Sequence, residues 1–196
     1  MEDGDKRFDE YKDHRNERRD RFQKIAKEII VPELDKVYDE NKKAKENGSY
    51  TFKNILFIEP VDYDTGRVID QWLNDHDDIS PYFFLANTSP HIQKLIIDDG
   101  YSELLFSTKE LDNIDRKDCV LVIEHFDMTD LKVRDHMKKL IEYRIANDIS
   151  VEGGKRKLEE LWYIIAIAYP EGHFGYEALT DNDISIFDTV VRLDNQ

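Results

Sequence analysis

The segment 54–68, NILFIEPVDYDTGRV, combines residue types that could hold a phosphate. An apolar run leads into a short loop that has one glycine, Gly66, and then a basic residue, Arg67. A strand followed by a glycine-containing loop is typical of a phosphate-binding loop, in which backbone N–H groups hold the anion. Asp62 and Asp64 oppose this interpretation, because a carboxylate about 4 Å from a phosphate would cost several kcal/mol at a protein surface.

The elements that must position this loop follow from the apolar pattern. Continuous apolar runs indicate central strands covered on both faces, and they lie at 54–59, 119–126 and 161–169. Weaker strand candidates lie at 81–87 and 188–194, and helical spacing marks the segments 66–75, about 90–98 and 130–147. Strands that alternate with helices predict an α/β fold in three layers, with a mainly parallel sheet of five strands.

The first 48 residues have a different pattern. Residues 5–29 mix acids and bases at helical spacing, and Pro32 is expected to break or restart this helix. A second helix is predicted over 33–46, ending at Asn47-Gly48. We therefore expect an N-terminal helical extension over 1–48 and an α/β core over 49–196. The first helix is either a solvated arm or a contact with a partner or another copy.

Composition narrows the class of protein. The net charge is −15, and residues 1–30 hold nine acids and nine bases, which leaves 34 acids against 19 bases in the remainder. Such a surface should repel nucleic acid and anionic membranes, and it serves either solubility or the binding of a basic partner. A single cysteine, an acidic start and the lack of a long apolar run predict a cytoplasmic protein that does not span a membrane.

Four segments together resemble one family. Residues 120–127, VLVIEHFD, resemble the Walker B segment of MoxR-like AAA+ ATPases, and 131–144 looks like the helix that follows it. Residues 163–179 resemble the sensor 1 strand with its loop, and 179–194 is similar to the segment L-x-P-A-L-L-D-R-F-D with its following strand. The resemblance covers about residues 50–194 and implies a sheet of the P-loop/AAA+ type.

This resemblance aligns the opening loop with the motif G-x-x-x-x-G-K-[ST]. Val61 then replaces the first glycine, Arg67 replaces the lysine, and Val68 replaces the hydroxyl that holds Mg²⁺. The resemblance also implies substitutions elsewhere: Glu124 for the Walker B Asp, His125 for the catalytic Glu, Tyr169 for the sensor 1 Asn and Ile186 for the inter-subunit Arg. The family's helical lid would follow the last strand, but the sequence ends at Gln196.

Coordinated loss of these groups is hard to reconcile with phosphoryl transfer, which depends on positioning and charge neutralisation. We therefore predict a catalytically inactive pseudo-ATPase without cofactor, which binds another protein such as an AAA+ subunit or a basic DNA-binding protein. One alternative is a divergent active ATPase that binds ATP and Mg²⁺ through Gly66, Arg67, Glu124, His125 and Tyr169. Another is an acidic inhibitor that mimics DNA and binds a DNA-binding protein.

Other candidate sites have weaker patterns. Glu124, His125 and Asp127 could be joined by His76 or His173 around a metal ion, but no paired-ligand spacing supports this, and no metal site is predicted. Cys119 opens an apolar run and is expected to be an inert core thiol. The segment 170–176, PEGHFGY, is interpreted as a turn or a contact loop, since exposed aromatic residues are good anchors.

Overall fold

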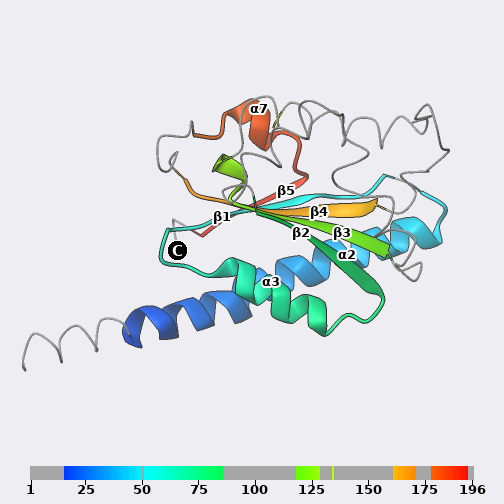
Figure 1. The fold of residues 1–196 in the computed structure, drawn as a ribbon. Coiled ribbons are helices and arrows are strands. Elements are labelled where there is room, and N and C mark those ends of the chain that lie inside the picture. Colours follow the sequence, from blue (N-terminus) through cyan, green and yellow to red (C-terminus); the bar gives the residue numbers. More distant parts are fainter. Residues whose placement is uncertain are drawn as a thin grey trace, which may run out of the picture.

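The computed structural model describes residues 16–49, 51–85, 118–128, 134, 161–170 and 178–193. They contain one sheet whose paired strands are all parallel (Figure 1). The order is β2-β3-β4-β1-β5, with bounds β1 Ile55–Ile58, β2 Ile79–Leu85, β3 Asp118–Glu124, β4 Leu161–Ala168 and β5 Thr189–Arg192. Each predicted strand overlaps an observed one, and the predicted parallel α/β sheet is confirmed.

The central strands are buried because their side chains are apolar on both faces. All four residues of β1 are buried, as are residues 162–168 of β4. The register places Ile58 of β1 beside Ala168 of β4 and Arg192 of β5, so these strands end at nearly the same level. Residues just after β1 and β4 therefore emerge side by side at the carboxyl edge of the sheet.

Helices lie on both sides of the sheet (Figure 1). Helix α3 (Thr65–Asn74), helix α2 (Val31–Glu46) and a π-helical turn, η1 (Ala26–Ile30), cover one face. The short helix α7 (Asp181–Ile184) and the 3₁₀ turn η2 (Phe126–Met128) lie on the other. The core on the α2 side is shared by helices and strands, and its largest contributors include Ile30, Leu34, Val37, Phe57, Trp72, Tyr163 and Ile165. From Ile25 onward, the described part of the predicted helical extension thus packs on the α/β core.

Of the two predicted effects of Pro32, a break in the N-terminal helix is wrong, whereas a restart fits the beginning of α2 at Val31, one residue before the proline. Residues 16–46 are helical throughout, and the turn before Pro32 is π-helical, with the Val31 N–H donating to the carbonyl of Ala26. Proline lacks an N–H and crowds the carbonyl four residues earlier, so a wider turn at this point lets the chain continue without a kink. Residues 5–15 of the predicted first helix lie outside the described residues.

The other helix predictions have mixed outcomes. Helix α2 ends at Glu46 and Gly48 has φ +72, as the predicted stop at Asn47-Gly48 requires. Helix α3 lies within one residue of its predicted span. The predicted helix at about 90–98 lies outside the described residues, as does 130–147 apart from Arg134. Within the described ranges, none of the helices combines the length and apolar character that crossing a bilayer requires.

The topology has a switch point beside β1. From β1 the chain enters α3 on one face of the sheet, whereas the next described helix after β4 is α7 on the opposite face (Figure 1). Because β1 and β4 are neighbours, this change of face marks a topological switch point at the carboxyl ends of the two strands. Open α/β sheets bind their ligands at such a point, which makes this edge the place to look for a site.

Candidate functional site

Glu59 is the residue directly after β1, and its carboxylate turns back to the start of α3. The side chain is buried, with 4% of its surface exposed, and its Oε2 accepts a hydrogen bond of 3.0 Å from the Thr65 N–H. Thr65 is the first residue of α3. The N–H groups in the first turn of a helix have no partner within the helix and favour negative charge. Glu59 therefore occupies a position at which a phosphate would bind.

Asp64 occupies a second position of the same kind. It is the N-cap residue of α3, and its Oδ1 accepts a hydrogen bond of 3.2 Å from the Arg67 N–H. Asp is a favoured N-cap residue because its side chain bonds the N–H two or three residues on. Together, Glu59 and Asp64 supply acceptors for two N–H groups of the first turn, so carboxylates of the chain itself cap this helix.

Glu124, the last residue of β3, brings a third carboxylate to the start of α3. A Cβ built on Gly66 would lie 2.8 Å from the Glu124 Oε1 and 3.3 Å from its carboxyl carbon. Real Cβ atoms do not approach other atoms this closely, so the absence of a side chain at Gly66 is what lets the carboxylate lie there. The glycine of the loop thus accommodates an internal acid.

The crowding of acids affects their protonation. Burial raises the pKa of Glu59 from its usual 4.5 to about 7, and the charges of Asp64 and Glu124 act in the same direction. The hydrogen bond from Thr65 opposes this rise. Burial also raises the pKa of Glu124, which His125 partly offsets. These carboxylates disfavour the binding of a further anion. The effect is strongest at and above neutral pH, where Glu59 becomes charged.

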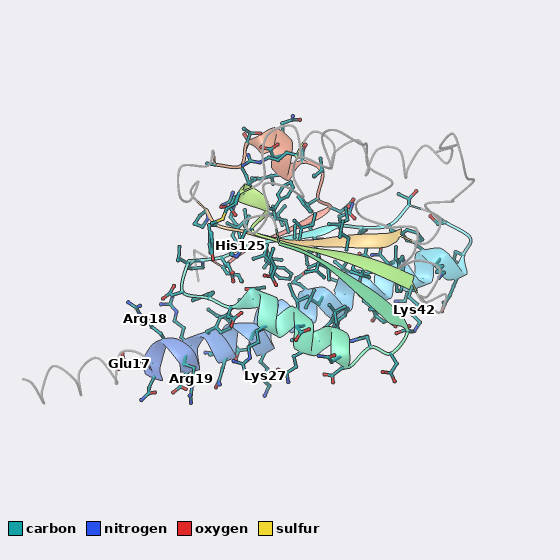
Figure 2. The ribbon with its side chains drawn as sticks, viewed as in Figure 1. Glu17, Arg18, Arg19, Lys27, Lys42 and His125 are labelled. Carbon is teal, nitrogen blue, oxygen red and sulfur yellow. The ribbon has the colours of Figure 1, made fainter. Side chains whose placement is uncertain are left out.

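His125 and Tyr169 meet at the same edge of the sheet. Their ring centroids are 5.3 Å apart with planes inclined by 39°. His125 has φ 58, in the left-handed region that non-glycine residues seldom adopt, and its carbonyl accepts the Met128 N–H of η2. The unusual backbone turns the chain directly from the end of β3 into η2. Figure 2 shows His125 at the opposite end of the sheet from Lys42.

Asp127 links the ends of β3 and β4. Its side chain is fully buried, and its Oδ1 accepts a hydrogen bond of 3.1 Å from the Tyr169 N–H. Its Oδ2 has no hydrogen-bond partner in the part of the chain that the structure describes. Burial raises the pKa of this carboxyl group, and the Tyr169 hydrogen bond limits the rise. Asp127 therefore fixes the segment after β4 relative to η2.

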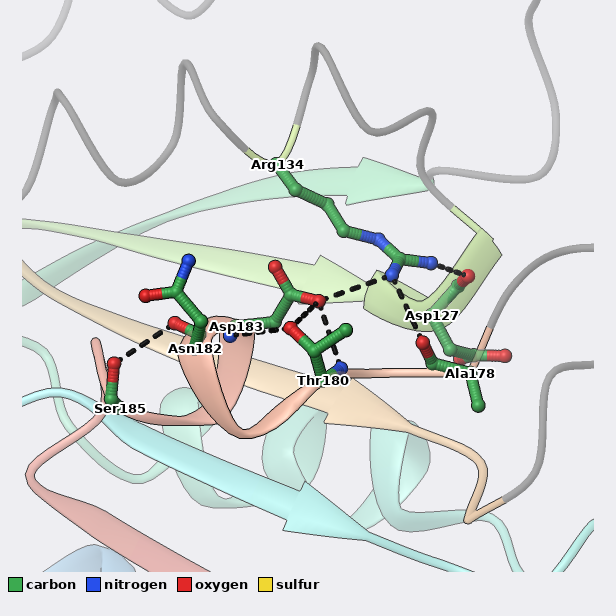
Figure 3. Close-up of polar contacts among 7 residues, drawn as sticks. All are labelled: Asp127, Arg134, Ala178, Thr180, Asn182, Asp183 and Ser185. Carbon is green, nitrogen blue, oxygen red and sulfur yellow. Dashed lines mark hydrogen bonds and ion pairs between the residues drawn. The ribbon is translucent and has the colours of Figure 1, made fainter.

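Arg134 connects this region to α7 through buried contacts (Figure 3). Its Nη1 lies 3.3 Å from the Asp183 Oδ2, and both side chains are almost fully buried. Its Nη2 donates to the carbonyl of Asp127. Asp183 also forms a reciprocal capping box with Thr180 at the start of α7. This ion pair fixes α7 against the segment that follows β3.

The structure brings most of the predicted site residues together. Gly66, Glu124, His125 and Tyr169 all lie at the carboxyl edge of the sheet, whereas the side chain of Arg67 is exposed. The half-buried Ile186 follows α7.

The possible metal ligands are not brought together. His76 packs on Trp72 with centroids 4.1 Å apart, after the carboxyl end of α3, and is therefore remote from His125. In the described ranges no three His, Cys, Asp or Glu side chains gather in a way that could hold a metal ion. His173, the Cys119 side chain and residues 171–176 of the predicted contact loop lie outside the description.

Sequence reasoning missed three functional candidates: Glu59, Arg134 and Asp183. Glu59 had a usable signal, since an acid that ends a continuous apolar run is placed at the rim of a buried strand. Asp183 also had one, because the spacing Thr180-x-x-Asp183 resembles a capping box, with Asp in place of the usual Glu. Arg134 had none, because nothing in the sequence sets this arginine apart from the other charged residues around it.

The parallel sheet with helices on both faces fits the AAA+ P-loop fold, as comparison with solved structures shows. Neither a protein-family model nor a curated protein sequence matches the chain. Among solved structures, a lysine-to-arginine mutant of RuvB from Thermotoga maritima matches with a TM-score of 0.52 at 11% identity, over 85% of this chain and 45% of that chain. At this identity the likeness shows the fold alone.

Two further structures are similar at lower scores. The RuvB Holliday junction branch migration motor of the same organism matches with a TM-score of 0.48 at 12% identity, over 85% of this chain and 45% of that one. A putative ATPase from Cytophaga hutchinsonii matches with a TM-score of 0.45 at 14% identity, over 83% of this chain and 51% of that one. The chain thus spans less than half the length of these RuvB chains.

Proposed function

We propose that this protein is a catalytically inactive AAA+-like protein, a pseudo-ATPase that acts by binding another protein. The observation that carries the proposal is the hydrogen bond from the Thr65 N–H to the buried Glu59 carboxylate. A nucleotide phosphate would need that N–H group, and it would enter a region that already holds an internal acid. The residues present therefore do not fit the phosphates of ATP.

Two neighbouring features support the same conclusion. Asp64 takes the Arg67 N–H, and Glu124 lies against Gly66, where a phosphate would approach the backbone. Val68 offers no oxygen to a Mg²⁺ ion, although hydroxyl ligands are what the motif uses at this place. Arg67, the basic residue within this segment, is exposed and has its own N–H bonded to Asp64.

Calorimetric titration with ATP–Mg²⁺ tests the proposal, together with an assay for released phosphate. We expect neither heat of binding nor phosphate release from the unmodified chain. Binding tighter than about 100 μM, which corresponds to roughly −5.5 kcal/mol, would contradict the proposal. The Glu59→Gln variant is titrated alongside the unmodified chain, because it keeps the side-chain shape and an acceptor for the Thr65 N–H while it removes the carboxyl group that can carry a charge.

A divergent active ATPase is the second candidate. The observation in its favour is that Gly66 and Glu124 adjoin each other at the first turn of α3, as a phosphate loop and its metal-supporting acid would. On this reading Arg67 contacts phosphate, Glu124 supports Mg²⁺, and His125 and Tyr169 line the nucleotide. The unmodified protein would then show turnover that Arg67→Ala abolishes.

The partner follows from the charge and from the family resemblance. We infer either another AAA+ subunit, including one of the MoxR-like group, or a basic DNA-binding protein that the acidic surface attracts. For the second partner, binding should compete with DNA and weaken as salt rises, because exposed charges are screened. A pull-down in which the captured contacts are insensitive to salt would favour the AAA+ subunit.

We also propose a cytoplasmic location for the protein. The division of the chain into a helical extension over 1–48 and an α/β core over 49–196 is part of the same proposal.

A further inference from the structure

The helical residues 16–25, which we call the strap, lie beside the loop that joins β1 to α3. Two contacts connect them. The rings of Phe22 and Tyr63 have centroids 4.9 Å apart with planes inclined by 48°, and the Arg18 Nη1 lies 3.4 Å from the Asp62 Oδ2. Figure 1 shows this helix, in dark blue, alongside the start of α3. Both contacts fall on the loop between Glu59 and Thr65.

The strap is anchored at one end and directed toward the loop at the other. Ile25 is buried in the core, and the helix continues from there through η1 into α2 without a break. Phe22 is partly buried, and the strap's other described residues are exposed. In Figure 2, Arg18 points toward the loop, whereas Arg19 and Lys27 point the opposite way. Only one side of this helix therefore faces the loop.

The loop depends on such contacts because it has few of its own. Its one backbone hydrogen bond among the described residues is from the Tyr63 N–H to the Pro60 carbonyl, at 3.0 Å. Val61 at its tip is 56% exposed, and Asp62 and Asp64 are exposed as well. The partly buried Tyr63 is thus the side chain by which the strap can control where the loop lies.

We propose that the strap is a conformational restraint, which holds the β1–α3 loop in the conformation where Glu59 and Asp64 cap α3. This inference rests on the proposed function, since it concerns how the N–H groups at the start of α3, where a phosphate would bind, stay bonded to Glu59 and Asp64. Glu59 directly precedes the loop and Asp64 is its last residue, so a shift of the loop moves these capping acids away from the Thr65 and Arg67 N–H groups. Release of the strap opens those two donors to solvent.

Amide hydrogen exchange, followed residue by residue by NMR on the full chain without nucleotide, tests the strap. In the double variant Arg18→Ala/Phe22→Ala we expect amide exchange at Thr65 and Arg67 to accelerate by about tenfold. Loss of the aromatic pair alone can account for up to about this factor, and loss of the ion pair adds to it. Exchange at Leu56 and Phe57 in β1 should not change. Alanine favours helix, so the strap helix itself is not weakened by these changes.

Two further comparisons make the result decisive. The control Arg19→Ala/Gln23→Ala changes exposed residues of the same helix and should leave Thr65 and Arg67 as in the unmodified chain. Arg18→Asp should accelerate their exchange by roughly two- to fivefold, the range of an exposed ion pair, and adding Asp62→Arg should reverse the effect. These exposed substitutions do not endanger folding.

Two outcomes would overturn the proposal. One is unchanged exchange at Thr65 and Arg67 in the double variant. The other is equal acceleration there and in β1, which would make the strap a general stabiliser. Neither depends on nucleotide, whereas the proposed function is tested by ATP–Mg²⁺ titration of the unmodified chain. A chain that binds ATP tightly would refute the inactive pseudo-ATPase, and the exchange data would still report whether the strap holds the loop.

Discussion

The carboxylate of Glu124 lies against the backbone of Gly66, with its Oε1 only 2.8 Å from where a Cβ on Gly66 would be. The contact joins the last residue of β3 to the first turn of α3. A glycine in a phosphate loop lets the backbone approach an anion, and here that anion is a side chain of the protein itself. The relationship explains why this position suits a glycine, since a larger residue would displace the Glu124 carboxylate.

The first prediction concerns this contact. Gly66→Ala should be neutral or destabilising by up to about 1 kcal/mol, because the gain from alanine in a helix is offset by displacement of the Glu124 carboxylate. In the Glu124→Ala background the same change should stabilise by about 0.5–1 kcal/mol. Urea unfolding of the four proteins measures the coupling between the two sites. Equal effects of Gly66→Ala in both backgrounds would show that the carboxylate does not press on Gly66.

The second prediction concerns pH. The pKa of Glu59 is about 7 in the folded protein and near 4.5 when the chain is unfolded. Between these values the folded state holds a proton that the unfolded state has lost, so stability falls as pH rises from about 4.5 through 7. The loss amounts to at most about 3 kcal/mol above pH 8, at about 1.36 kcal/mol per pKa unit.

Glu59→Gln removes this dependence and keeps an acceptor for the Thr65 N–H. The variant should match the unmodified protein near pH 4.5 and exceed its stability by about 2–3 kcal/mol at pH 8, as measured by urea unfolding across the range. An NMR titration of the Glu59 carboxyl carbon gives an independent check. A midpoint near 4.5 would mean that burial does not affect this carboxyl group as described.

The third prediction concerns the backbone of His125. Its φ of 58 costs a non-glycine residue roughly 1–2 kcal/mol, and glycine adopts this conformation freely. His125→Gly and His125→Ala both remove the ring contact with Tyr169, but only glycine relieves the backbone. We therefore expect the glycine variant to be more stable than the alanine variant by about 1 kcal/mol in thermal or urea unfolding. The reverse order would indicate a different backbone at this residue.

The fourth prediction concerns the buried ion pair of Arg134 and Asp183. Asp183→Ala should cost about 3–5 kcal/mol, because it leaves the arginine buried without its carboxylate and also removes the capping box of α7. Asp181→Ala, an exposed change in the same helix, should cost less than about 1 kcal/mol. The denaturant midpoints of the two variants measure these losses of stability. Similar small losses in both would show that the ion pair contributes little to stability.

Most of the fold could be predicted because burial leaves a local pattern. The runs that contain Ile55–Ile58 and Ile164–Ala168 are apolar without interruption, as strands covered on both faces must be. The stop of α2 was predictable from Gly48, which adopts the left-handed conformation. That the helix continues across Pro32 was not predictable, because the π-helical turn before the proline has no signal in the sequence. The buried Ile30 and Leu34, on either side of the proline, join the core.

The candidate site was predicted in part. The sequence pointed to Glu124, His125 and Tyr169 as residues that follow strands, and strand ends in a parallel sheet share one edge. It did not distinguish Glu59 from any other acid after an apolar run, and it did not predict that Arg134 is buried. Those properties depend on which neighbours surround a side chain, and neighbours far apart in sequence are set by strand order.

The amino-acid sequence by itself determined the strands, the helix that follows the loop, the two acids within the loop and the excess of acids. Each of these is a property of residue type and local spacing. Only the tertiary structure decided that Glu59 caps Thr65, that Glu124 lies on Gly66 and that Phe22 packs on Tyr63. The last two contacts join residues far apart in the chain. The bend that brings Glu59 back to Thr65 is local, but neither residue type nor spacing specified the path of the loop between them.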